Sequence, residues 1–182
     1  MGSGTWLALA LLGALLGGAV VLYNRLVADR NQVRQGYADI DVQLKRRADL
    51  VPRLVDTVRA YAGYEKALLT SVTGLRASAL AAREAAERFG IERALGARLQ
   101  QLVVLQEAYP QLKADENFRQ LAGALVEVED HLQYARRFYN GAVKQYLTRI
   151  ESFPDLIVAR ALGFRPAPFF ETDDREAVRV TL

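Results

Sequence analysis

Apolar side chains recur every three or four residues along three long stretches of this 182-residue chain. A mean spacing near 3.5 is the period at which α-helices pack side by side with a left-handed twist. Each helix alone would expose its apolar seam, so the seams must face one another. The pattern therefore predicts an all-α fold, an elongated antiparallel helical bundle of about four long helices. The first series is Tyr37, Ile40, Leu44, Ala48, Val51, Val55, Val58, Ala62, Leu69 and Val72, interrupted at Glu65; the second is Phe118, Leu121, Leu125, Val128, Leu132, Ala135, Tyr139, Ala142, Tyr146 and Ile150; the third, shorter one is Ile91, Leu95, Leu99, Leu102, Leu105 and Tyr109.

Proline, glycine and capping residues predict where these helices begin and end. Pro52 should kink the first long segment or start a new helix, and Asp115 is a suitable N-cap. We expect helices near residues 24–50, 52–88, 91–108 and 115–152, the first of them able to continue a membrane helix. The expected ends are Phe89-Gly90, Tyr109-Pro110 and Phe153-Pro154.

The chain divides by composition into residues 1–24, a bundle over residues 25–154, and a tail over residues 155–182. The tail holds Pro166 and Pro168, and its last residues, 178–182, alternate apolar and polar like a strand. We expect an extended tail that packs on the bundle; a docking segment for a partner is the alternative. The tail also carries an acidic patch of Glu171, Asp173, Asp174 and Glu176.

The first 24 residues contain no charged side chain. Residues 6–22 are 17 consecutive apolar residues, which as a helix would span about 25 Å, close to what a bilayer requires. Trp6 and Tyr23 flank this run, where interfacial aromatic residues are usual. A cleaved signal peptide is the competing interpretation, but no basic residue precedes the run. The sequence therefore predicts a transmembrane anchor in contact with the lipid bilayer.

Positive charges follow the apolar run, at Arg25, Arg30 and Arg34, and only Asp29 offsets them. The positive-inside rule then places the bundle in the cytoplasm and the N-terminus outside. Gly13 and Gly17 form a GxxxG spacing that would allow a homo-oligomer through close helix approach.

The residues required for common chemistries are scarce. The chain has no cysteine and one histidine, His131, with Val128 instead of a glutamate three residues before it. A helical di-metal site needs two Glu-x-x-His pairs, so His131 is expected to have a structural or surface role, with Glu127 placed to pair with it across one helical turn. No phosphate-binding glycine loop is present, and a net charge of +3 does not suggest nucleic-acid binding. We predict no catalytic residue, no cofactor and no metal.

Several blocks of the chain, from about residue 23 to the end, resemble the LemA family of bacterial membrane proteins. The sequence departs from the family pattern at Tyr64, Arg53 and Leu147, where the family usually has His, Asn and Asn. The resemblance implies an N-terminal membrane helix in the bacterial inner membrane and a long antiparallel helical domain. It implies no reaction. Family members are often encoded near a membrane metalloprotease of the heat-shock type, which suggests a partner in membrane protein quality control. The matching blocks are Tyr23–Val27, Arg30–Val33, Asp39–Pro52, Tyr109–Ala114, Phe118, Glu129, Arg136, Tyr139-Asn140, Phe153-Pro154 and Gly163-Phe164.

Together these features predict a single-pass, non-enzymatic interaction or scaffold protein. The alternative is a signal relay, in which a helix continuous from the membrane transmits a shift through Pro52. The unidentified partner would be a membrane or cytoplasmic protein. The partner would bind a polar surface of the bundle. The alternative is that the polar residues of this surface form ion pairs and hydrogen bonds between helices. That candidate surface comprises Asp39, Asp41, Lys45, Arg46, Arg47 and Asp49, with Arg136 and Asn140.

Overall fold

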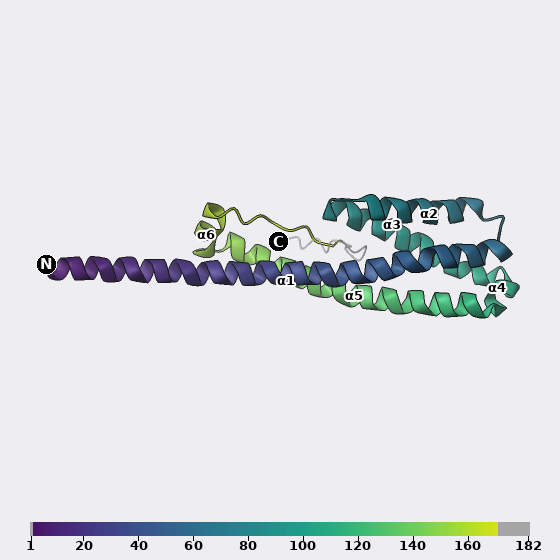
Figure 1. The fold of residues 1–182 in the computed structure, drawn as a ribbon, viewed down its shortest axis with the longest axis horizontal. Helices are drawn as coiled ribbons and strands as arrows, with labels where there is room; N and C mark the ends of the chain where they lie inside the picture. Colours follow the sequence, from purple (N-terminus) through teal and green to yellow (C-terminus); the bar gives the residue numbers. More distant parts are fainter. Residues whose placement is uncertain (1, 171–182) are drawn as a thin grey trace, which may run out of the picture. The chain divides into compact units, whose positions relative to one another are not determined.

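The computed structural model describes residues 2–170, without the side chains of Ser3 and Thr5. This part of the chain is helical and contains no strand, which confirms the predicted all-α class. The elements, labelled in Figure 1, are α1 (Ser3–Tyr61), α2 (Lys66–Ala81), α3 (Ala85–Val104), the 3-10 turn η1 (Leu105–Glu107), α4 (Pro110–Ala114), α5 (Glu116–Glu151) and α6 (Asp155–Ala161).

The predicted helix boundary at Pro52 is wrong, because α1 continues through Pro52 to Tyr61. A proline inside a helix has no N–H for the carbonyl four residues earlier, here that of Ala48. Arg76 of α2 donates a hydrogen bond from Nε to this carbonyl at 2.7 Å. A side chain from a neighbouring helix thus replaces the missing donor, and the helix is not forced to end.

Two further boundaries differ from the prediction. The segment expected as one helix over residues 52–88 is divided between the end of α1, the whole of α2 and the start of α3. Phe89-Gly90 lies inside α3 instead of ending a helix. In contrast, α5 begins just after Asp115 as predicted, because the Asp115 carboxylate accepts the Phe118 backbone N–H at 2.8 Å and caps the helix.

The described chain forms two compact units, of which the second holds residues 39–136 with 169 and 170. Its core is built from the later part of α1, from α2, α3 and α4, and from the first half of α5, and α2 packs against α3 (Figure 1). Fully burying one such side chain contributes about 1.5–3 kcal/mol, so this apolar seam is the main source of stability. The core residues are Val51, Leu54, Val55, Val58, Ala62, Leu69, Val72, Leu95, Leu99, Leu102, Leu112, Phe118, Leu121 and Leu125.

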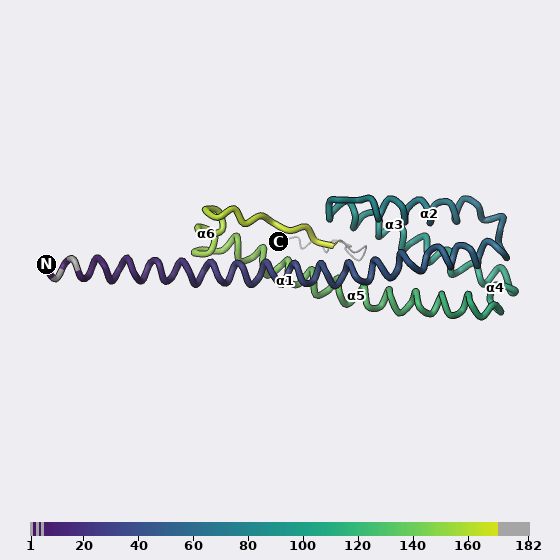
Figure 2. The backbone as a smooth tube through the Cα atoms, in the orientation of Figure 1, coloured from purple at the N-terminus to yellow at the C-terminus, as the bar shows by residue number. Residues whose placement is uncertain are grey.

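The first unit holds residues 2–38 and 137–168. Here the backbones of α1 and α5 come close: a Cβ added to Gly36 would lie 2.9 Å from the Tyr139 Cα. The Tyr139 hydroxyl donates to the Pro168 carbonyl at 2.6 Å, and burial raises the pKa of Tyr139 to about 12. The Tyr146 hydroxyl donates to the Arg165 carbonyl at 3.0 Å. The backbone tube in Figure 2 can be followed from α6 along this returning segment.

The expected tail is therefore partly helical, since its first residues form α6, a seven-residue helix. Residues 165 and 168 receive hydrogen bonds from the α5 tyrosines, so this segment lies on α5. The acidic patch at Glu171, Asp173, Asp174 and Glu176 and the strand-like residues 178–182 lie outside the described residues.

Candidate functional site

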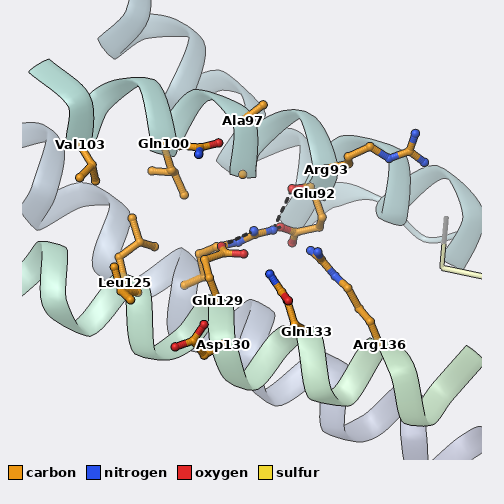
Figure 3. A pocket seen from close by; sticks show the side chains of 14 residues that line it. Glu92, Arg93, Ala97, Gln100, Val103, Leu125, Glu129, Asp130, Gln133 and Arg136 are labelled. Atoms are coloured by element: carbon orange, nitrogen blue, oxygen red, sulfur yellow. Dashed lines mark hydrogen bonds and ion pairs between the residues drawn. The ribbon is translucent and has the colours of Figure 1, made fainter. Parts of the chain in front are cut away.

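A cleft of about 410 Å³ opens between α3 and α5 in the second unit, with Arg47 of α1 at its base. Figure 3 shows the two helices facing each other, with Glu92 and Arg93 on one side and Glu129, Gln133 and Arg136 on the other. Its wall is apolar at one end and charged at the other. The lining residues are Arg47, Glu92, Arg93, Gly96, Ala97, Leu99, Gln100, Val103, Leu125, Val126, Glu129, Asp130, Gln133 and Arg136.

Arg47 is fully buried and joins the three helices that form the cleft. Its Nη1 donates to Glu129 Oε1 at 2.7 Å, and its Nη2 donates to the Glu92 carbonyl oxygen at 2.9 Å and to the Glu92 carboxylate. Glu92 is 2% exposed, whereas the Glu129 side chain is 31% exposed. A buried charge is tolerated only when it is paired and hydrogen-bonded, and the planar guanidinium can serve two carboxylates at once.

The close approach of Arg47 to α3 depends on a glycine. A Cβ added to Gly96 would lie 3.1 Å from Arg47 Nη1, tighter than ordinary van der Waals contact. Gly96 thus leaves room for a guanidinium that both glutamates hold in position. Any larger residue there would have to displace it.

Arg136 forms the charged rim of the cleft. Its guanidinium carbon lies 4.3 Å from the centroid of the Phe170 ring, and Phe170 packs on Phe89 with 4.2 Å between ring centroids. Burial, and next the positive charge of Arg47, lower the pKa of Arg136 from its usual value. A cation over an aromatic face is stabilised by the ring quadrupole. The described chain thus ends with a buried aromatic side chain held at this rim.

The described side chains that line the cleft include no Cys, Ser, Thr, Tyr, Lys or His. Among the described residues, no group of three or more His, Cys, Asp or Glu is placed to hold a metal ion. The cleft instead offers guanidinium, carboxylate and amide groups beside an apolar wall. Such a combination is suited to binding a polar segment of another molecule.

The structure separates the residues of the predicted interaction surface. Arg47 does not belong to a surface, because it is buried and paired with two glutamates, so the inter-helical ion-pair interpretation holds for it. Asp41 pairs with Arg88 at 2.7 Å. Arg136 lines the cleft, and Asn140 belongs to the first unit. The remaining members, Asp39, Lys45, Arg46 and Asp49, are exposed on α1.

Glu92 and Glu129 were missed as partners of Arg47. A signal for them exists in the sequence, since Glu92 stands in register with Leu95 and Leu99 on the apolar seam of α3. Arg47 likewise stands three residues after Leu44. A charged residue at a seam position predicts a buried partner of opposite sign, although it cannot say which one. The predicted pairing of His131 with Glu127 is confirmed at 3.7 Å on the surface of α5.

The apolar start of α1 is the second feature with functional meaning. It is the one helix in the described chain that is long and apolar enough to cross a membrane, with a mean hydropathy of 2.2 in its best window. None of that window is buried inside the protein, which distinguishes it from the core helix of a globular domain. Trp6 is 65% and Tyr23 42% exposed, and the space around Gly13 and Gly17 is open.

These features define a class: over the described residues, it is a helical protein with one N-terminal candidate membrane span and two compact units of helices. The chain matches the LemA family over residues 36–182, and it therefore belongs to the LemA family. This confirms the resemblance noted in the sequence.

The relatives carry two different names. Magnetosome proteins MamQ 2 and MamQ 1 of Paramagnetospirillum magneticum are each 22% identical over 184 residues, which cover 87% of this chain and 68% of the relative. Protein LemA of Metamycoplasma hominis is 25% identical over 161 residues, covering 86% of this chain and 72% of the relative. Two of these names refer to the magnetosome and the third does not.

Proposed function

We propose that this protein is a single-pass, membrane-anchored interaction protein without catalytic activity. One observation carries the proposal: the same uninterrupted helix, α1, contains an unburied, charge-free span and, further on, core residues such as Leu54 and Val58. A helix of this kind joins the span to a folded helical unit with no break in its secondary structure. The charges at Arg25, Arg30 and Arg34 support a cytoplasmic bundle at a bacterial inner membrane.

The cleft around Arg47 is the surface that we propose for a partner protein. Its rim combines half-buried Arg136 with exposed Gln133 and Asp130, so it suits a partner segment that carries both charges and amides. The LemA resemblance favours a membrane protein as that partner, with a membrane metalloprotease as the first candidate.

Two measurements test this function. Carbonate washing of membranes from expressing cells should leave the full-length protein in the pellet. A photocrosslinking residue in place of Gln133, which lines the cleft, should then capture a defined protein, whereas the same residue in place of exposed Arg53, which does not line it, should not. Release by carbonate would overturn the anchor, and equal crosslinking from both positions would overturn the cleft as the binding surface.

A signal relay is the second candidate, and the continuity of α1 through Pro52 favours it. A continuous helix can transmit a displacement along its length. Because the chain has no cysteine, cysteine pairs placed on α1 and α5 before and after Pro52 would report such a movement cleanly. A crosslinking pattern that is the same under all membrane conditions would exclude the relay.

A further inference from the structure

The segment that joins α5 to α6 and continues to residue 165 exposes several large apolar side chains. We call residues 153–165 the α6 corner. Phe153 is 80% exposed, Ile157 61% and Leu162 57%. Single exposed apolar residues are ordinary, but three on one short segment form a feature that calls for an explanation.

The α6 corner lies beside the end of the apolar span. The Phe164 ring contacts the ring of Tyr23 edge to face, with 6.1 Å between centroids, and Tyr23 directly follows Leu22, the last residue of the apolar run. The Arg30 guanidinium carbon lies 4.8 Å from the centroid of the same Phe164 ring. Figure 1 shows α6, in yellow-green, next to α1 within the first unit.

The pairing of α1 with α5 independently places the start of the α6 corner next to the end of the apolar span. Gly36 lies against Tyr139, and Asp29, further toward the span, accepts a hydrogen bond from Arg149, further along α5. The two helices are therefore antiparallel here, and α5 approaches the span as it proceeds. With about 1.5 Å of rise per residue in each helix, Phe153 reaches the first charged turn after the span.

The charge of this unit suits a membrane surface with anionic lipid. Residues 2–38 and 137–168 contain eight Arg and Lys against three Asp and Glu, a net charge of +5, while the whole chain has +3. Asp155 is the one acidic residue of the α6 corner, and it is buried, 3.8 Å from Arg149. Arg160 and Arg165 are exposed. The corner thus presents apolar and positive groups and no exposed carboxylate.

We propose that the α6 corner is a second membrane contact, which inserts Phe153, Ile157 and Leu162 among the lipid headgroups around the emerging α1. Arg160 and Arg165 bind the phosphates of anionic phospholipids. Interfacial segments of this composition bury their apolar side about 5–10 Å deep and gain from anionic lipid. The proposal rests on the membrane anchoring proposed above. If so, the first unit contacts the bilayer both through the span of α1 and through the α6 corner. The second contact would prevent this unit from turning freely about the axis of the span.

Tryptophan fluorescence tests the proposal, because Trp6 is the only tryptophan of the chain. In a Trp6→Phe background, Phe153→Trp and Ile157→Trp each place a reporter at an exposed site that should tolerate it. In discs of phosphatidylcholine and phosphatidylglycerol, a nitroxide near the headgroup should quench both reporters about twofold, as for residues at interfacial depth.

Phe138→Trp in the same background is the matched control. Phe138 is 49% exposed, belongs to the same unit and lies against Gly36, so it stands about 20 Å beyond Leu22 along α1 and should not be quenched. Quenching of the two corner reporters no greater than that of the control would overturn the proposal and would assign the corner to a protein partner.

A measurement on the native protein tests the membrane anchor separately from the α6 corner. Trp6 of the unsubstituted chain should be quenched by lipid nitroxides whatever the corner does. Loss of Trp6 quenching would overturn the anchor and, with it, this proposal. Quenched Trp6 with unquenched corner reporters would overturn the second contact alone.

The charge component has its own test. Quenching of the Phe153→Trp reporter should fall when phosphatidylglycerol is replaced by phosphatidylcholine, and the Arg160→Gln/Arg165→Gln pair should remove this lipid dependence. An unchanged lipid dependence in the double variant would show that these arginines do not bind the phosphates.

Discussion

Arg47 on α1 and Glu129 on α5 stand 82 positions apart in the chain and meet at 2.7 Å. The same guanidinium binds both the carboxylate and the backbone carbonyl of Glu92 on α3. One buried cation therefore fixes the relative register of three helices. Such a network specifies the arrangement of the helices more than it adds net stability, because burying the charges costs much of what their pairing returns.

Replacing Arg47 with Met should destabilise the protein by about 3–5 kcal/mol, because the Glu92 charge stays buried without its partner. The stability of Arg47→Lys should lie between that of Arg47→Met and that of the native protein, since an ammonium cannot serve both glutamates in the same geometry. The measurement is denaturant unfolding of the full chain in detergent. Exposed Arg46→Ala is the control and should stay within about 0.5 kcal/mol of the native protein.

A second substitution should rescue the first. In the Arg47→Met background, Glu92→Gln removes the buried charge and should recover part of the lost stability, with a coupling of about 0.5–3 kcal/mol in a double-mutant cycle. Strictly additive effects would show that the two side chains do not depend on each other.

The hydrogen bond from Arg76 to the Ala48 carbonyl should matter only because Pro52 is present. Arg76→Leu should cost about 1–2 kcal/mol in the native chain, since it leaves that carbonyl without a donor. In a Pro52→Ala chain the new backbone N–H can bond to Ala48, so the same substitution should cost distinctly less. Thermal unfolding of the four proteins measures the difference. Arg83→Leu, at an exposed site between α2 and α3, is the control for loss of an arginine.

Gly36→Ala should separate α1 from α5. The added methyl group would lie 2.9 Å from the Tyr139 Cα, a backbone atom that cannot rotate away, and we expect a loss of about 1–3 kcal/mol. Gly141→Ala in the same unit has nothing within 4 Å and should instead stabilise α5 by about 0.5–1 kcal/mol. If both alanines stabilise the protein to the same degree in chemical unfolding, the close helix contact is absent.

Protonation of Asp115 should lower the stability of the protein at acid pH. Its pKa lies below the usual 3.8, first because the carboxylate accepts the Phe118 N–H and next because it accepts the Tyr61 hydroxyl. A carboxyl whose pKa is lower in the folded state contributes stability above its unfolded pKa and loses it as the pH falls through the folded value.

Asp115→Ala should therefore lower the melting temperature by a few degrees at pH 7 and flatten its decrease below about pH 4. Asp115→Asn, which caps a helix without titrating, should retain more of the stability at neutral pH and show the same flattening. Exposed Asp49→Ala serves as the control, and an acid limb identical to that of the native protein in both Asp115 variants would contradict the assignment.

Sequence periodicity was a sound guide where the seam was long and uninterrupted, as in α5, whose start at Asp115 and end before Phe153-Pro154 agree with the prediction. It failed where one seam continues across a chain reversal. The apolar series running from Tyr37 to Val72 predicts no chain reversal after Tyr61, yet α1 ends at Tyr61 and α2 begins at Lys66. Residues 82–84, Ala-Arg-Glu, are all good helix formers, and still the chain turns there so that α2 can pack on α3.

The candidate site was predicted only in part. Arg136, expected on the candidate surface, lines the cleft, whereas Arg47, expected on the same surface, is buried against two glutamates that the sequence pattern did not assign to it. The sequence of a single helix does not distinguish an arginine inside the apolar seam from an arginine at the edge of that seam. Its burial depends on whether α3 and α5 bring carboxylates to it.

The sequence by itself determined that this protein is helical and begins with an apolar span, because hydrophobic periodicity and charge-free length are properties of residues a few positions apart. Only the tertiary structure decided that α1 continues through Pro52, that Arg47 is buried, and that Phe164 returns to Tyr23. Each of these depends on a donor, a carboxylate or a ring from a distant part of the chain. Local pattern cannot specify such partners, since it fixes which face of a helix is buried and not what that face meets.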